Sequence, residues 1–197
     1  MQVYLHKTVL SADKLMQNIF KRVRKLMMTG KKLYHASPAL QFFLETNPSA
    51  KKGITSEILQ KYLQLDDNDV FQSIKYWQHA DDIILSNLCN RFLARTLFRT
   101  TFLDKKPSAG LKAKVEAKTQ KSLKKKGLPH DEHAAKYYFS FDESFSEAYR
   151  YESEGIWILE EKDRAVEFSK AADTENIIAL TEPVVKPYVV HLKDIEI

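Results

Sequence analysis

Three residues near the amino terminus carry side chains that could together contact a nucleotide. Tyr4, His6 and Lys7 place a phenol, an imidazole and an ammonium group within four residues, at the start of an expected helix. The phenol could lie against a sugar, the imidazole could hydrogen-bond a base, and the ammonium group could bind phosphates. Spacing alone is equally typical of an ordinary helix start, so it leaves both interpretations open.

Three other groups of reactive side chains are better explained as structural features than as chemical sites. His130 and Asp131, with His133 nearby, could hold a metal, but they lie where a turn leads into a helix and carboxylates are expected as caps. Residues 66–69 (DDND) lack the spacing and the glycine of a calcium loop and also favour a helix cap. Cys89 lies in an apolar helical run, which predicts a buried thiol without chemistry.

The composition excludes several classes of protein. One cysteine rules out a disulfide framework and a cysteine-rich zinc site, and is typical of a reducing compartment. The five glycines form neither a G-x-G-x-x-G motif nor a Walker A loop. No apolar run is long enough to span a membrane, and the amino terminus lacks the pattern of a signal peptide. We therefore expect a cytoplasmic protein with no membrane partner.

The net charge of +5 conceals an uneven distribution of charge. Residues 1–103 carry +7, residues 104–126 carry a further +7 with nine lysines, and residues 127–197 carry −9. The lysine-rich segment is a candidate for binding nucleic acid, because clustered cations release counterions on contact with phosphates. It contains no aromatic residue and no arginine, which favours a solvated helix face turned toward the acidic carboxy-terminal block.

The first hundred residues predict a helical array. Apolar residues recur at steps of three and four from residue 9 to residue 27, and Gly30 then provides a stop. Ser37 and Pro38 predict the start of a second helix. Further starts are expected at residues 55–56, 67–69 and 81–82, where hydroxyl or acidic residues precede apolar periodicity.

The second half predicts a mixture of helices and strands. Within the lysine-rich run of residues 105–126, a helix is expected near 109–126 with Gly127 as its stop, and another helix is expected near 170–180. Strands are expected over residues 136–141, 155–159, 164–168 and 186–192, with a turn at 160–163. The predicted fold class is α+β, with a helical region over 1–103 and a small region of antiparallel sheet plus helices over 104–197.

Four segments follow one another in the first hundred residues, and their order and spacing are characteristic. They are residues 2–9 (QVYLHKTV), 36–44 (ASPALQFFL), 65–70 (LDDNDV) with Ile74 and Lys75, and 82–86 (DIILS) leading into 91–99 (RFLARTLFR). These segments resemble the part that follows the catalytic core in bacterial HD-domain phosphohydrolases of the deoxynucleoside triphosphate triphosphohydrolase type. The α+β second half is compatible with the carboxy-terminal region of that branch.

The resemblance implies roles for individual side chains. It places Tyr4 against the sugar of the substrate nucleotide. It also implies an allosteric nucleotide site between subunits, and hence a homo-oligomer that binds a dNTP or GTP. The residues implied for that allosteric site are His6, Lys7, Arg95, Leu97 and Arg99.

The metal ligands of such enzymes are missing from this chain. The resemblance implies a His, His-Asp, Asp set upstream of the Tyr-x-His-Lys segment, yet only residues 1–3 precede Tyr4. We therefore expect no catalytic residue, no metal ligand and no cofactor in this chain, with a divalent metal only in a full-length enzyme. The chain is interpreted as a carboxy-terminal portion that contributes nucleotide contacts and an oligomer interface and is inactive alone. Alternatives are a regulatory nucleotide-binding module or a nucleic-acid-binding, oligomerising module.

Overall fold

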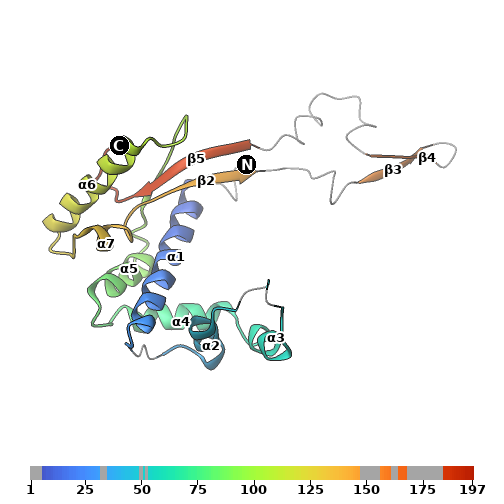
Figure 1. Ribbon diagram of the computed structural model, residues 1–197, viewed down its shortest axis with the longest axis horizontal. Helices are drawn as coiled ribbons and strands as arrows, with labels where there is room; N and C mark the ends of the chain where they lie inside the picture. Colours follow the sequence, from blue (N-terminus) through green and yellow to red (C-terminus); the bar gives the residue numbers. More distant parts are fainter. Residues whose placement is uncertain are drawn as a thin grey trace.

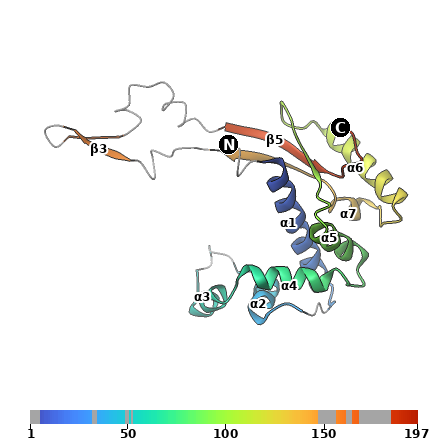
Figure 2. The same cartoon turned by 180° about the vertical axis from the view of Figure 1, so that it is seen from behind.

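A computed structural model describes residues 6–31, 35–48, 51, 53–146, 156–160, 164–167 and 184–197. The fold is α+β, as predicted, with helices followed by small antiparallel sheets. Figure 1 shows the larger sheet beside helix α6 in the upper part of the molecule, and helices α2, α3 and α4 in the lower part. Helix α1 runs from one part to the other, as the view from behind in Figure 2 also shows.

The long amphipathic helix predicted from periodicity is α1 (Lys7–Met28). Its apolar positions face the core, with Leu15, Ile19 and Val23 fully buried. At its end Gly30 adopts a left-handed φ of 81°, and the flanking amides bond back to the carbonyls of the last turn. The predicted helix and its glycine stop are confirmed.

Four further helices begin near the expected cap residues. They are α2 (Pro38–Thr46), α3 (Ser56–Leu63), α4 (Asp67–Trp77) and α5 (Ile83–Leu93). In each, the preceding side chain accepts hydrogen bonds from free backbone N–H groups of the first turn, which is the function of an N-cap. Those caps are Ser37, Thr55, Asp66 and Asp82.

A three-stranded antiparallel sheet joins the two halves of the sequence. Its strand order is β1 (Arg99–Phe102), β5 (Val184–His191) and β2 (Ser140–Ser146). The sequence analysis expected helix up to about residue 100 and did not predict β1. The strand forms because β5, distant in the sequence, supplies its hydrogen-bonding partners. Strand β2 begins four residues later than expected, since the N–H groups of Tyr137 and Tyr138 bond back to the carbonyls of Ala134 and Ala135 in the turn that ends α7 (Glu132–Ala135).

The remaining described elements are α6 (Ala109–Lys125), α7 (Glu132–Ala135) and a hairpin of β3 (Trp157–Glu160) with β4 (Arg164–Glu167). The lysine-rich helix is thus confirmed, and so is its stop at Gly127, with a φ of 67°. Of the turn expected at 160–163, Glu160 belongs to β3, and residues 161–163 lie outside the described residues, as does the helix expected at 170–180. In Figure 1 the hairpin lies at the opposite end of the molecule from α6.

One hydrophobic core includes residues from both halves of the chain. Buried side chains of α1, α4 and α5 pack in the same cluster as Leu123, Tyr188 and Leu192. The carboxy terminus is held to α6 by an ion pair between Lys126 and Asp194 and a hydrogen bond from Lys118 to the carbonyl of Glu196. Within the described part of the chain, no helix is long and apolar enough to cross a membrane.

Candidate functional site

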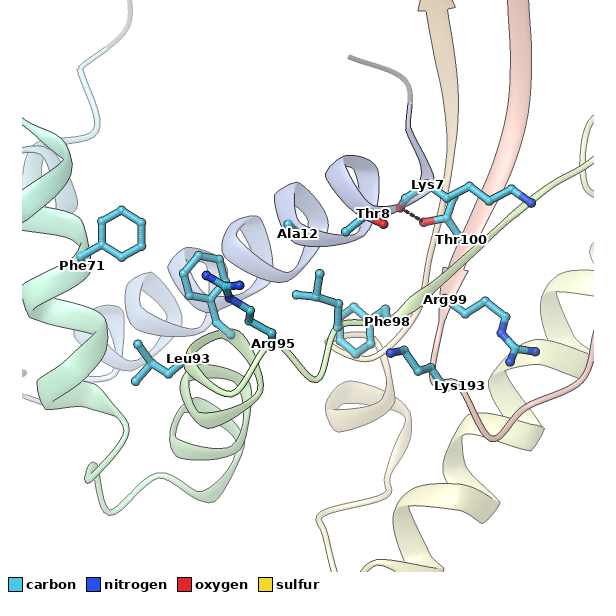
Figure 3. Close-up of a pocket in the computed structure, with 12 residues that line it drawn as sticks. Lys7, Thr8, Ala12, Phe71, Leu93, Arg95, Phe98, Arg99, Thr100 and Lys193 are labelled. Atoms are coloured by element: carbon cyan, nitrogen blue, oxygen red, sulfur yellow. Dashed lines mark hydrogen bonds between the residues drawn. The ribbon is translucent and has the colours of Figure 1, made fainter. Parts of the chain in front are cut away.

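A pocket of about 900 Å³ opens where the start of α1, the end of α5, β1 and the end of β5 meet. Figure 3 shows its lining side chains. Four of them are cationic and exposed, and none of the described residues that line the pocket is acidic. The four are Lys7, Arg95, Arg99 and Lys193.

Arg95 occupies a backbone position that usually belongs to glycine. It follows the end of α5, where its N–H donates to Phe92 O at 3.2 Å and the N–H of Thr96 donates to Arg91 O at 2.8 Å. This is the Schellman arrangement, which requires a left-handed residue. The ends of α1 and α6 use Gly30 and Gly127 there, whereas Arg95 has a φ of 53°. A non-glycine residue in this conformation costs about 1 kcal/mol.

Arg99 lies opposite His191 in the β1–β5 ladder. The His191 ring is buried, and its Nδ1 donates to Leu192 O at 2.8 Å. Nε2 therefore accepts from the Thr101 hydroxyl at 3.1 Å in the neutral ring. Burial lowers the pKa of His191, and the positive charge of Arg99 lowers it further. Arg99 thus lies opposite a buried imidazole ring whose pKa is lowered.

Lys7 enters the pocket through the first turn of α1. Its carbonyl accepts a 2.9 Å hydrogen bond from the buried hydroxyl of Thr100, which ties the start of the helix to β1. Its ammonium group lies 5.9 Å from the ring centroid of Phe102, a cation–π distance. In Figure 3 the ammonium group points away from Arg95. Lys7 therefore lines one end of the pocket.

The other end of the pocket is apolar and aromatic. Phe71 of α4 and Phe92 of α5 have ring centroids 6.0 Å apart at an angle of 40°. Phe71 is 44% exposed, so one side of this pair is open. Leu93 lies beside Phe71 at this end in Figure 3, away from Arg99 and Lys193. The pocket therefore has two chemically different ends.

The structure brings together four of the residues that the resemblance implied. Lys7, Arg95, Leu97 and Arg99 all line the pocket. His6 does not, since it caps α1 and its Nδ1 accepts from the N–H of Thr8 at 3.3 Å. Tyr4 lies outside the described residues.

Lys193 and Phe71 are among the lining residues that the sequence did not mark as candidates. Lys193 reaches the pocket only because β5 pairs with β1, and Phe71 only because α4 packs on α5. Helix α4 faces the core through Ile74 and Trp77. The available sequence signal for Phe71 was that it is a large aromatic residue outside this buried face.

The side chains that could have held a metal have structural roles instead. Asp131 caps α7 by accepting from the N–H of Ala134 at 3.0 Å. Asp66 and Asp69 form a reciprocal capping box at the start of α4. No three His, Cys, Asp or Glu side chains within the described ranges are grouped so that they could hold a metal ion. Cys89 is fully buried, and burial raises the pKa of its thiol to about 12.

Comparison with solved structures shows that nearly the whole chain is similar in fold to part of a phosphohydrolase. The chain superposes on a crystal structure of phosphohydrolase BT4208 from Bacteroides thetaiotaomicron with a TM-score of 0.79 and 26% sequence identity. The match covers 98% of this chain and 47% of that one, corresponding to its carboxy-terminal half. The chain therefore resembles the carboxy-terminal part of a phosphohydrolase.

A sequence comparison gives a second similar protein. The chain is 30% identical over 98 residues to the uncharacterized protein YwfO of Bacillus subtilis, a match that covers 50% of this chain and 21% of YwfO. No family model matches the sequence. The chain thus spans about half the length of the solved phosphohydrolase, and its match to YwfO covers about a fifth of that protein.

Proposed function

We propose that the chain is the carboxy-terminal portion of an HD-type phosphohydrolase, in which it forms a regulatory site for a nucleotide polyphosphate and contributes to the contacts between subunits. The observation that carries this proposal is the gathering of Lys7, Arg95, Arg99 and Lys193 around one pocket without an acidic neighbour among its described lining residues. Like charges repel one another, so such a cluster is stabilised when a polyanion binds between them.

The backbone of Arg95 supports the same proposal. A glycine at this helix end would remove the cost of the left-handed conformation, as it does at the ends of α1 and α6. Non-glycine residues in unfavourable backbone conformations cluster at binding and catalytic sites, where the function of the side chain outweighs the conformational cost. The guanidinium group can bind a phosphate through two parallel hydrogen bonds.

Calorimetry with GTP and dGTP tests the proposal. We expect heat of binding with the wild-type chain and at least about tenfold weaker binding after Arg95→Ala combined with Arg99→Ala, because each charge-assisted hydrogen bond contributes about 1.5–3 kcal/mol. The matched control is Lys114→Ala, which removes an exposed cation of α6. Absence of binding, or binding that the arginine variants leave unchanged, would refute the proposed site.

The lysine-rich helix supports a second candidate function, binding of nucleic acid. Lys114, Lys118, Lys121 and Lys125 recur at helical spacing and share one face of α6. Although Lys118 bonds to the carboxy-terminal segment, the other three are exposed. Binding of this kind would weaken steeply with salt. If neutralising Lys118, Lys121, Lys124 and Lys125 leaves DNA and RNA binding unchanged, this candidate is excluded.

A further inference from the structure

Aromatic and aliphatic side chains concentrate at one end of the pocket, where Arg95 also lies, and two further cations lie at the other end. Phe71, Phe92 and Leu93 form one end, and Arg99 and Lys193 form the other. Figure 3 shows Phe71 and Arg99 at opposite ends of the pocket. In this view Arg95 lies closer to Phe71, and Phe98 lies between Arg95 and Arg99. A ligand that fits this distribution has a flat apolar group at one end and negative charge at the other.

We propose that the nucleotide binds in one orientation, with its base against Phe71 and Phe92 and its terminal phosphates between Arg99 and Lys193. This inference rests on the proposed function and adds to it the direction of the ligand and two specificity-determining residues, Phe71 and Lys193. The volume of about 900 Å³ lies in the range of pockets that bury small-molecule ligands.

The aromatic end offers a stacking surface. The two rings lie 6.0 Å apart at 40°, so they are tilted toward one another without being stacked face to face. Phe71 lies outside the fully buried face of α4, which Ile74 and Trp77 form, and its ring is 44% exposed while its other side contacts Phe92. Base–aromatic stacking contributes about 1–3 kcal/mol per base. The guanidinium plane of Arg95 can add to it, because arginine stacks on aromatic faces.

The cationic end is suited to the phosphates. Arg99 extends from β1 and Lys193 from the turn that follows β5, and β1 pairs with β5 in fixed register. The backbone positions from which the two side chains extend are therefore fixed relative to one another. The ring of His191, which lies opposite Arg99 in the ladder, is buried and bonded to Thr101 and to Leu192 O, so it offers no free acceptor to compete with phosphate oxygens.

Two single variants and two probes test the orientation. Binding of GTP and of inorganic triphosphate would be measured by calorimetry for the wild type, Phe71→Ala and Lys193→Ala. Phe71→Ala should weaken GTP at least about fivefold and leave inorganic triphosphate unchanged, since only GTP carries a base. Lys193→Ala should weaken both probes by the same factor, about tenfold.

The matched controls are exposed residues outside the pocket. Phe145→Ala removes a phenylalanine of β2 that is 52% exposed, and Lys114→Ala removes a cation of α6. Neither should change either affinity. Phe71→Trp should restore GTP binding, which a merely structural role of Phe71 would not predict.

The outcomes separate this inference from the function on which it rests. If GTP binds and Phe71→Ala leaves its affinity unchanged, or weakens triphosphate equally, the orientation is wrong while the anion site stands. If Lys193→Ala affects neither probe, the assignment of the phosphate end is wrong. If the wild-type chain binds neither GTP nor triphosphate, the proposed function itself fails and the orientation fails with it.

Discussion

Arg22 and Asp82 form a two-point ion pair that fastens α1 to the start of α5. Arg22 Nε donates to Asp82 Oδ1 at 2.9 Å, and Arg22 Nη2 donates to Oδ2 at 2.6 Å. The same carboxylate caps α5 by accepting from the N–H of Leu85 at 2.9 Å. Burial by itself would raise the pKa of Asp82, but the bonds from Arg22 and Leu85 outweigh it and lower that pKa. Helix α5 ends at Leu93, two residues before Arg95, so this pair helps to position the pocket.

Removing the carboxylate of Asp82 should destabilise the fold strongly. Asp82→Ala removes the helix cap and leaves Arg22, whose side chain is only 20% exposed, without its partner. We expect a loss of about 3 kcal/mol in the free energy of unfolding, measured by urea denaturation. Asp82→Asn keeps a capping oxygen and should lose less. The control Asp66→Ala removes an exposed cap that forms no ion pair with any Arg or Lys among the described residues, and an equal loss there would contradict the special role of Asp82.

The helices were largely predictable because their signals are local. The periodicity of apolar residues was enough to predict α1. Ser37 and Pro38 predicted the start of α2, because the serine caps the first turn and the proline fixes φ at its first residue, and both effects are local. Strand β1 was not predictable, because Arg99–Phe102 has no apolar alternation and forms only by pairing with β5. The start of the strand at residue 136 was predicted wrongly because aromatic residues such as Tyr138 are frequent in strands. In the structure Tyr138 lies before β2 and its side chain is buried in the core.

The candidate site was predictable only in part, for the same reason. Arg95 and Arg99 belong to one short segment, and the resemblance identified them by sequence. Lys193 and Phe71 come from segments that approach only in the folded chain, through the β1–β5 ladder and the packing of α4 on α5. No sequence signal marks such a juxtaposition.

Stability should fall as the pH drops below about 6.5, through His191. Its folded pKa is lowered by burial, so the unfolded chain, with a pKa near 6.5, binds the proton more readily. The stabilisation is therefore present above pH 6.5 and decreases below it, by up to about 1.4 kcal/mol per pH unit. Urea midpoints at pH 7.5, 6.5 and 5.5 would measure the effect. His191→Gln should flatten the profile over this range, and an unchanged slope in that variant would exclude His191 as its source.

Replacing Arg95 should separate stability from binding. Arg95→Gly relieves the left-handed φ of 53° and should raise the free energy of unfolding by about 1 kcal/mol, while it weakens binding of GTP. Arg95→Ala should weaken binding equally without this gain, because alanine has the same conformational cost. Thermal denaturation and calorimetry on both variants provide the comparison. A glycine variant that is no more stable than the alanine variant would show that the backbone there is unstrained.

The chain alone should release no inorganic triphosphate from dNTPs in the presence of Mn²⁺ or Mg²⁺. Hydrolysis of the HD type needs a metal that activates water, and a metal needs at least three convergent ligands. The described residues contain no such group, and the one His-Asp pair uses Asp131 as a helix cap. A malachite-green assay coupled to a pyrophosphatase that cleaves triphosphate would detect the product. If the chain releases triphosphate with metal and His130→Ala abolishes this activity, residues 130–131 form a working metal site. If the activity persists in His130→Ala, the metal ligands lie elsewhere in the chain.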